Sequence, residues 1–281
     1  MAITFTDIKP LIGATVHAAR DELFTAEAAA MIRAKLEERG VLVFPGLGLD
    51  DGEQLRFTDL LGGRVKLTRD ASSQETDENI YQVTLDPKIN RQPEYVLGTF
   101  FYHMDGITVD MPPPLATLLS ARQVAKAGGE TEFASTYAAY EQLPEAEKRA
   151  IEGLRVVHSV ASSLRVIADA IPEDDRERVM SIGLRNEHPL VWTRRSGRKS
   201  LVIGSSADTI VGWPVVQGRA LIARLNEWAG QPAFSLRHAW QAGDFVIWDN
   251  TGALHRALPY AADSGRLMHR TSIAGVESVA A

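Results

Sequence analysis

The chain contains no cysteine, and this absence removes several kinds of site. Without cysteine there is no disulfide framework, no thiolate metal ligand and no cysteine nucleophile. Any metal bound by this chain must therefore be held by nitrogen and oxygen atoms.

Long apolar runs and a surplus of basic residues are also missing. No stretch of about 18 apolar residues occurs, so no transmembrane helix is expected. The first 23 residues lack the basic start and apolar core of a secretory signal. Lysine and arginine number 30 against 36 acidic residues, a net charge of −6, which is unlike most nucleic-acid binders. We expect a cytoplasmic protein that binds neither membranes nor nucleic acid.

What is present is an ordinary globular composition, with 45% hydrophobic and 23% charged residues in 281. No repeat or linker divides the chain, which predicts a single domain over residues 1–281. Helices are expected at 25–39, 52–63, 136–154 and 215–230, and 173–183 is ambiguous. Residues 66–95 are polar and weakly patterned, with a short strand at 80–85. We expect this region to form a mobile loop that covers the active site.

The last two thirds of the chain carry many short runs of β-forming residues separated by turn residues. These runs lie at 115–124, 131–135, 154–160, 188–194, 199–204, 234–240, 244–250 and 268–275. The pattern predicts a mainly β fold with flanking helices, as a closed sheet, a sandwich or a jelly roll.

The stretch FFYHMDGI places His103 and Asp105 two residues apart in an apolar run. In a strand both side chains would face the same way, and burying them without a partner is costly. Two histidines and one carboxylate with open positions are typical of non-haem Fe(II) oxygenases. Among the seven histidines, His255 is the best candidate for the second one, because it follows a buried-looking strand and a turn in DFVIWDNTGALH.

The stretch GRLMHRTSIAG carries Arg266 and Arg270 four residues apart, on one face of a predicted strand. Two guanidinium groups inside a barrel would be unfavourable alone. They are favourable opposite anions, and arginine binds carboxylates through a bidentate fork.

The order of H-x-D, GGET, WDN with a later histidine, and R-x-x-x-R resembles the TauD/TfdA family of Fe(II)- and 2-oxoglutarate-dependent dioxygenases. The likeness runs from about residue 97 to 275. It implies a double-stranded β-helix, or jelly roll, with His103, Asp105 and His255 as the iron ligands. It also implies that Thr131 and Arg266 hold the far carboxylate of 2-oxoglutarate and that Arg270 meets an acidic group on the substrate.

The activity implied by the resemblance is hydroxylation of a small or medium organic acid, which is a carboxylate, sulfonate or sulfate. Dioxygen is consumed, and 2-oxoglutarate is decarboxylated to succinate and CO2. Thr99 stands where sulfonate-oxidising members carry an amide that meets the substrate amine, and Tyr102 stands where many members carry tryptophan. Both are candidate substrate contacts, and both differences argue against taurine itself.

Relatives in this family often form dimers or tetramers, so a homo-oligomer is expected. An alternative from another class is a non-catalytic jelly roll that keeps a metal for structure. A zinc hydrolase on the same ligands would need a general base, and none is evident near YHMDGI.

Overall fold

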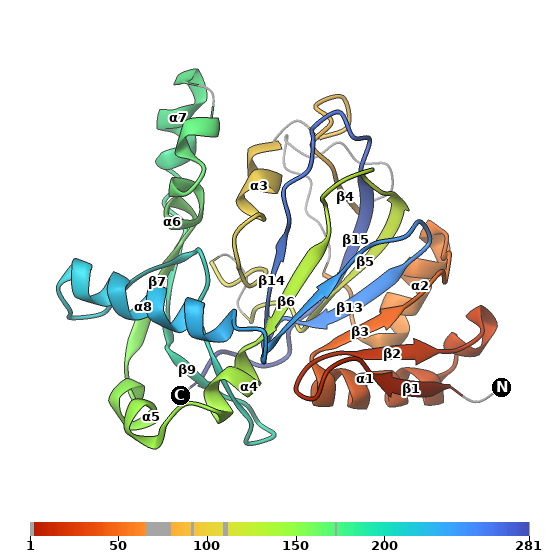
Figure 1. Cartoon of the computed structure of the whole chain (residues 1–281), viewed down its shortest axis with the longest axis horizontal. Helices are drawn as coiled ribbons and strands as arrows, with labels where there is room; N and C mark the ends of the chain where they lie inside the picture. The colour runs from red at the N-terminus through yellow and green to blue at the C-terminus, as the bar shows by residue number, and fades with distance from the viewer. Residues whose placement is uncertain (1–2, 66–79, 91–92, 109–111, 172, 281) are drawn as a thin grey trace.

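The computed structural model of the chain describes residues 3–65, 80–90, 93–108, 112–171 and 173–280. Its largest element is a twisted sheet with the strand order β1-β2-β3-β13-β5-β15-β4 (Figure 1). The strands are Thr4–Asp7, Ala14–His17, Val41–Phe44, Phe245–Asp249, Ala116–Gln123, Leu267–Ile273 and Tyr81–Val83, in that order. Strands near both ends of the chain therefore meet in the middle of one sheet.

A smaller sheet, with the order β12-β6-β14, packs against the larger one. Its strands are Ser235–His238, Thr131–Ser135 and Ala253–Ala257. A buried cluster fills the space between the two sheets and includes Phe133 and Leu236 from the smaller sheet and Leu119, Val246, Trp248 and Met268 from the larger. These two packed sheets form the predicted jelly roll.

The other face of the larger sheet is covered by α1 (Ala26–Arg39) and α2 (Asp51–Leu61). Strand residues alternate between faces, so Val43 points into the sandwich while Leu42 and Phe44 pack toward these helices. Thr25 caps α1 by accepting a hydrogen bond from the Ala28 amide. Asp50 caps α2 in the same way through the Glu53 amide.

The rest of the chain forms a second layer around the smaller sheet. It contains the sheet β11-β7-β8 (Ala207–Ile210, Arg155–Ser159, Arg185–Pro189) and the hairpin of β9 (Val191–Thr193) and β10 (Lys199–Leu201). The helices are α3 (Pro93–Gly98), α4 (Thr136–Glu141), α5 (Glu145–Ile151), α6 (Val160–Arg165), α7 (Glu173–Met180) and α8 (Val215–Ala229), with short 3-10 turns at Arg20–Leu23 and Ala168–Ala170. No helix within the described ranges is long and apolar enough to cross a membrane.

Some elements differ from the sequence prediction. The single helix expected at 136–154 is two helices, because Pro144 has no amide hydrogen to continue the first one. The strand expected within 66–95 is present as β4, but α3 also forms there, and residues 66–79 lie outside the described residues. Whether this region is a mobile lid stays a prediction.

Candidate metal centre

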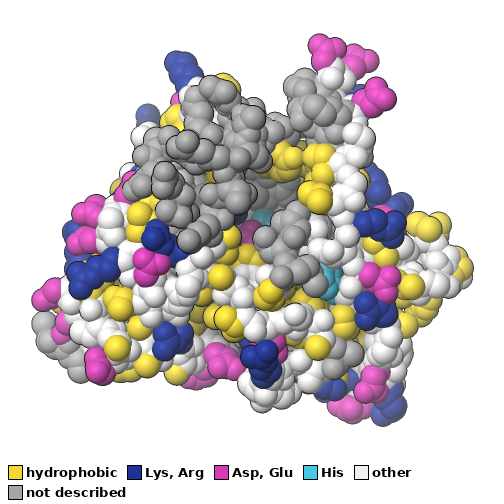
Figure 2. Space-filling view, turned by 180° about the vertical axis from the view of Figure 1, so that it is seen from behind, with side chains coloured by type: hydrophobic (Ala, Val, Ile, Leu, Met, Phe, Trp, Pro, Cys, Tyr) yellow, Lys and Arg dark blue, Asp and Glu magenta, His cyan; other side chains and the backbone are white. Residues whose placement is uncertain are grey.

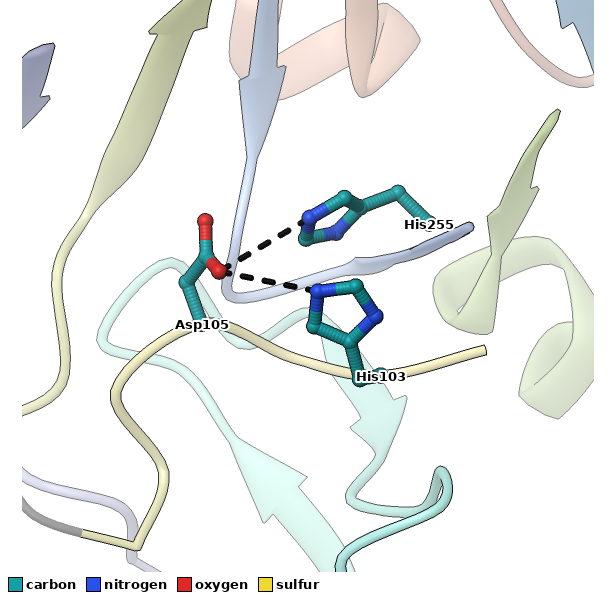
Figure 3. A group of neighbouring side chains, drawn as sticks. All are labelled: His103, Asp105 and His255. Atoms are coloured by element: carbon teal, nitrogen blue, oxygen red, sulfur yellow. Dashed lines mark ion pairs between the residues drawn. The ribbon is translucent and has the colours of Figure 1, made fainter. Parts of the chain in front are cut away.

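The side chains of His103, Asp105 and His255 converge on one point (Figure 3). The Nε2 atoms of His103 and His255 lie 3.8 and 3.7 Å from Oδ1 of Asp105. One potential ligand atom from each residue lies within 4.8 Å of the others. The structure therefore brings together the three residues that the sequence predicts as metal ligands.

Backbone pairing fixes two of the three ligands relative to each other. The amide of His103 donates to the carbonyl of His255 at 3.1 Å, and the amide of His255 donates back at 3.1 Å. His255 lies in β14, opposite Phe133 of β6. The sequence predicts a strand through both His103 and Asp105. The structure has only an isolated bridge at His103 and a turn at Asp105, yet both side chains still face His255.

Gly204 lets another segment pack directly on the His103 backbone. A Cβ atom at this position would lie 3.1 Å from His103 Cα and 3.1 Å from the Tyr102 carbonyl oxygen, and the φ angle is +118°. The neighbouring Ser205 amide donates to the same Tyr102 carbonyl at 2.7 Å. Only glycine suits both the conformation and the space, so the 204–205 segment holds the ligand-bearing loop against the smaller sheet.

The two histidine rings are oriented by different contacts. Nδ1 of His103 lies 2.9 Å from the Phe101 carbonyl oxygen, so Nδ1 carries the proton and Nε2 is left with a lone pair. The His255 ring is held by packing, with ring centroids 4.5 Å from Trp248 and 4.1 Å from His103. Both rings present Nε2 toward Asp105.

The protonation states of this group are those that a metal needs. Burial and the neighbouring His103 lower the pKa of His255 to about 3, so its imidazole is neutral near pH 7. Burial alone would raise the pKa of Asp105. The nearby His255, Arg270 and His103 and a hydrogen bond from Thr117 outweigh burial and hold that pKa below its ordinary value. A neutral imidazole and an ionised carboxylate are ligating forms, and a nitrogen and oxygen set with a single carboxylate suits Fe(II).

Arg270 lies at the edge of the metal-binding group. Its Nη1 atom is 3.6 Å from Oδ1 of Asp105, and its side chain is 30% exposed. The guanidinium carbon lies 4.8 Å from the centre of the Tyr81 ring. Arg270 thus presents a positive charge beside the open side of the site.

Arg266 is buried, with 3% exposure, and no carboxylate in the described ranges lies within ion-pair distance of it. Its guanidinium packs 4.8 Å from the centre of the Tyr260 ring, and burial lowers its pKa. A Cβ atom at Gly129, which has φ +79°, would lie 3.0 Å from Arg266 Cδ and Nε. A buried guanidinium without a counter-ion is costly, so this position fits a ligand that carries an anion.

Thr131 lies in β6, and 3% of its surface is exposed. Its hydroxyl oxygen accepts a hydrogen bond from Nε1 of Trp240 at 2.9 Å, which leaves the hydroxyl proton free to donate. Trp240 and Tyr260 were not singled out from the sequence. Their contacts with Thr131 and Arg266 depend on strand packing that spacing does not reveal.

The side chains of Thr99 and Tyr102 contact residues other than the three metal ligands. The Thr99 hydroxyl donates to the Val96 carbonyl at 2.7 Å, at the end of α3. The Tyr102 hydroxyl lies 3.4 Å from Glu132, and its ring lies 4.4 Å from the Arg256 guanidinium. Arg256 pairs with Glu132 across β14 and β6, on the face opposite His255 and Phe133. Contact of either residue with a substrate stays a prediction.

On the face of the molecule shown in Figure 2, histidine and acidic side chains are visible in a recess bordered in part by hydrophobic side chains. A metal ion held only by His103, Asp105 and His255 would keep open positions for further ligands.

Known proteins resemble this chain along most of its length. The family model described as "Taurine catabolism dioxygenase TauD, TfdA family" matches residues 4–272. An alpha-ketoglutarate-dependent 2,4-dichlorophenoxyacetate dioxygenase from Cupriavidus pinatubonensis is 34% identical, over 97% of this chain and 98% of its own. An alkylsulfatase from Acinetobacter baylyi is 31% identical, over 87% of this chain and 76% of its own.

A solved structure resembles this chain over its full length. The crystal structure of AAD-2 in complex with Mn(II) and N-oxalylglycine superposes with a TM-score of 0.83 at 29% identity. The match covers 100% of both chains.

Proposed function

We propose, from the premise that this chain belongs to the TauD/TfdA family of Fe(II)- and 2-oxoglutarate-dependent dioxygenases, that it hydroxylates a small or medium organic acid. The acid group is a carboxylate, a sulfonate or a sulfate. The family reaction couples oxidation of the substrate to the decarboxylation of 2-oxoglutarate to succinate and CO2. Iron with 2-oxoglutarate and dioxygen supplies the oxidising power, and the protein supplies binding, orientation and exclusion of water.

The observation that carries this proposal is Arg270 beside the three ligands. Its guanidinium lies 3.6 Å from Asp105 and remains partly exposed, so a substrate anion can reach it. An acid held there would place its neighbouring C–H bonds close to the metal. Arginine binds carboxylates, sulfonates and sulfates by the same forked geometry, and this explains why we propose a class of acids.

The names of the relatives support an acid with a heteroatom next to the reacting carbon. Those relatives include enzymes named for 2,4-dichlorophenoxyacetate, for phenoxypropionate and for alkylsulfates. Hydroxylation of a carbon attached to oxygen or sulfur gives an unstable product that breaks the adjacent bond. We therefore propose that cleavage of an ether, sulfonate or sulfate ester follows hydroxylation.

The two arginines have separate roles in this proposal. Arg266 and Thr131 hold the far carboxylate of 2-oxoglutarate, because Arg266 is buried without a carboxylate partner among the described residues and the Thr131 hydroxyl can still donate. Arg270 holds the acid group of the substrate. His103, Asp105 and His255 hold Fe(II).

The proposal is tested by assaying succinate from purified protein with Fe(II), ascorbate and 2-oxoglutarate. A panel of aryloxyalkanoic acids, alkyl sulfates, sulfonates and neutral analogues is added one compound at a time. We expect acids, and not the neutral analogues, to stimulate succinate release. Stimulation by the neutral analogues alone, or by no compound in a broad panel, would contradict an acid substrate. Metal binding without any oxygen consumption would instead favour the non-catalytic alternative.

We also propose a homo-oligomer of two or four copies in the cytoplasm. The family resemblance supports the first point, and the cysteine-free composition is compatible with the second. Light scattering coupled to size-exclusion chromatography tests the assembly, and cell fractionation tests the location. A monomer or a membrane-associated fraction would contradict the corresponding point.

A further inference from the structure

Two buried polar residues behind Asp105 form a chain of hydrogen bonds that ends on this ligand. The Thr117 hydroxyl donates to Oδ2 of Asp105 at 2.6 Å, and the side-chain amide of Asn250 donates to the Thr117 oxygen at 2.8 Å. Thr117 is 0% exposed and Asn250 is 2% exposed. Because the threonine has one proton and its oxygen already accepts from Asn250, that proton is directed at Asp105.

This chain of hydrogen bonds makes the two carboxylate oxygens of Asp105 inequivalent. Oδ1 faces the Nε2 atoms of both histidines at 3.8 and 3.7 Å. Oδ2 is turned away and held by Thr117 at a distance typical of a strong hydrogen bond to a charged oxygen. Chelation of a metal through both oxygens would require Oδ2 to give up this hydrogen bond.

The number of open metal positions depends on this difference. Three protein atoms on an octahedral ion leave three positions, which a chelating 2-oxo acid and dioxygen fill. If Asp105 used both oxygens, the protein would occupy one position more and the cosubstrate and dioxygen would compete for the remainder. The geometry thus favours a ligand set in which Asp105 contributes Oδ1 only.

Both residues stand on rigid parts of the fold. Thr117 lies in β5, a central strand of the larger sheet, paired with Trp248 on one side and Ser272 on the other. The backbone amide of Asn250 donates to the Leu115 carbonyl at 3.0 Å. Oδ1 of Asn250 is buried and has no hydrogen-bond partner in the part of the chain that the structure describes. A buried side-chain carbonyl without a hydrogen bond is unfavourable. This cost is more readily tolerated where the NH2 group of the same side chain has a function, such as its hydrogen bond to Thr117.

We propose that Thr117 and Asn250 are positioning residues that hold Asp105 as a one-oxygen ligand and so keep a coordination position open. The inference rests on the metal site of the proposed function. Thr117 lies outside the motifs that carry the family resemblance, whereas Asn250 ends the WDN motif and is expected from the sequence to be a turn or hydrogen-bonding residue rather than a metal ligand.

The test compares Thr117→Val, which removes the hydroxyl at constant shape, with Thr117→Ser, which keeps it. Anaerobic calorimetry measures Fe(II) affinity, and the visible charge-transfer absorption of the Fe(II)–2-oxoglutarate chelate reports how the cosubstrate binds. We expect Thr117→Val to lose about 10- to 100-fold in metal affinity, as is typical for partners of metal ligands, or to lose the chelate absorption at saturating metal. Thr117→Ser should retain both. Thr58→Val, which removes another buried hydroxyl, is the matched control and should leave both unchanged.

Affinity and chelate absorption of Thr117→Val equal to those of the wild type would overturn the inference while leaving the proposed function intact. Failure of the wild type to bind Fe(II) would instead contradict the proposed function. Because Thr117→Val could fold poorly, a second measurement uses the wild type. A crystal structure with Mn(II) and N-oxalylglycine should show Asp105 bound through Oδ1 with the Thr117 hydrogen bond kept, and chelation through both oxygens would overturn the inference.

Discussion

At the scale of single residues, Arg266 and Arg270 differ by their surroundings, and Arg266 lies just before β15 while Arg270 lies within it. Arg270 is partly exposed and lies beside Asp105, whereas Arg266 is buried against Tyr260 with no carboxylate among the described residues. The first therefore suits a ligand that varies and enters from solvent. The second suits a ligand that is always the same and is enclosed when bound.

We predict that replacing each arginine raises the KM for a different ligand. Arg266→Ala should raise the KM for 2-oxoglutarate roughly 10- to 100-fold, the equivalent of about 1.5–3 kcal/mol for charged hydrogen bonds, with a smaller effect on the organic acid. Arg270→Ala should raise the KM for the organic acid more than that for 2-oxoglutarate. Arg256→Ala is the control, because Arg256 follows His255 but points to the other face and pairs with Glu132. Equal effects of both site variants on both ligands would contradict the division of roles.

Removal of the buried positive charge of Arg266 should not weaken the ligand-free fold. We predict that Arg266→Met unfolds at the same temperature as the wild type or higher, because an apolar side chain replaces a buried guanidinium that has no carboxylate partner among the described residues. The rise in melting temperature that 2-oxoglutarate gives the iron-loaded wild type should be absent from the variant. A large loss of stability without ligand would show that Arg266 has a protein partner instead.

Sequence spacing identified the ligands but not the residues that orient them. The rule that places His103 and Asp105 on one face also places Tyr102 on the other, and the structure has Tyr102 against Glu132 and Arg256. Alternation thus separates the Tyr102 side chain from the two ligands, and its contact with a substrate stays a prediction. Thr117 gave no comparable signal, because a threonine in a buried strand is common and its partner lies in a different segment.

At the scale of elements, the ligand-bearing loop depends on a close backbone contact rather than on strand pairing. Residues 103–105 make one bridge to β14, and the loop is also held by the segment at Gly204 and by the hydrogen bond from Thr117 to Asp105. The sequence predicted a strand here because the residues are apolar and aromatic. Local propensity could not reveal that a distant glycine takes the place of the second strand neighbour.

We predict that Gly204→Ala weakens metal binding as well as stability. Backbone strain at positive φ should lower the unfolding free energy by about 1–3 kcal/mol, and the new methyl group would push against the His103 backbone at 3.1 Å. Gly197→Ala is the matched control, since Gly197 has φ +84° and nothing within 4 Å of the added atom. The control should lose stability only. Denaturant unfolding and metal titration separate the two effects, and an equal change of metal affinity in both variants would refute the role of Gly204.

At the scale of the whole molecule, the short strands predicted a closed sheet, a sandwich or a jelly roll, and the family resemblance implied the jelly roll. The long helices were predicted from periodicity. The strands β1, β2, β11 and β14 were not predicted, because each is only four or five residues long and all of them carry polar or charged residues. Their pairing comes from the packed sandwich. Such short strands are specified by their neighbours in space more than by their own residues.

We predict that the fold loses stability in acid through its buried histidines. Burial and the nearby His188 lower the pKa of His158 to about 3, against an ordinary value near 6.5. Between these values the unfolded chain binds a proton that the folded chain does not, so stability falls as the pH falls, by about 1.4 kcal/mol per pH unit for this residue. Denaturant unfolding at pH 7.5, 6 and 5 should show a smaller pH slope for His158→Gln than for the wild type. Parallel slopes would contradict the assignment, whatever the absolute stability of the variant.

The backbone bridge joins His103 to His255, and the ribosome adds these two ligands at different times. A ribosome makes the first two ligands early, and the third, followed by both arginines, comes only with the final strands. The nascent chain therefore carries an incomplete chelate until residue 255 has been added. We expect Fe(II) to bind only after this third ligand is present, so fragments ending before residue 250 should bind none while the 281-residue chain does.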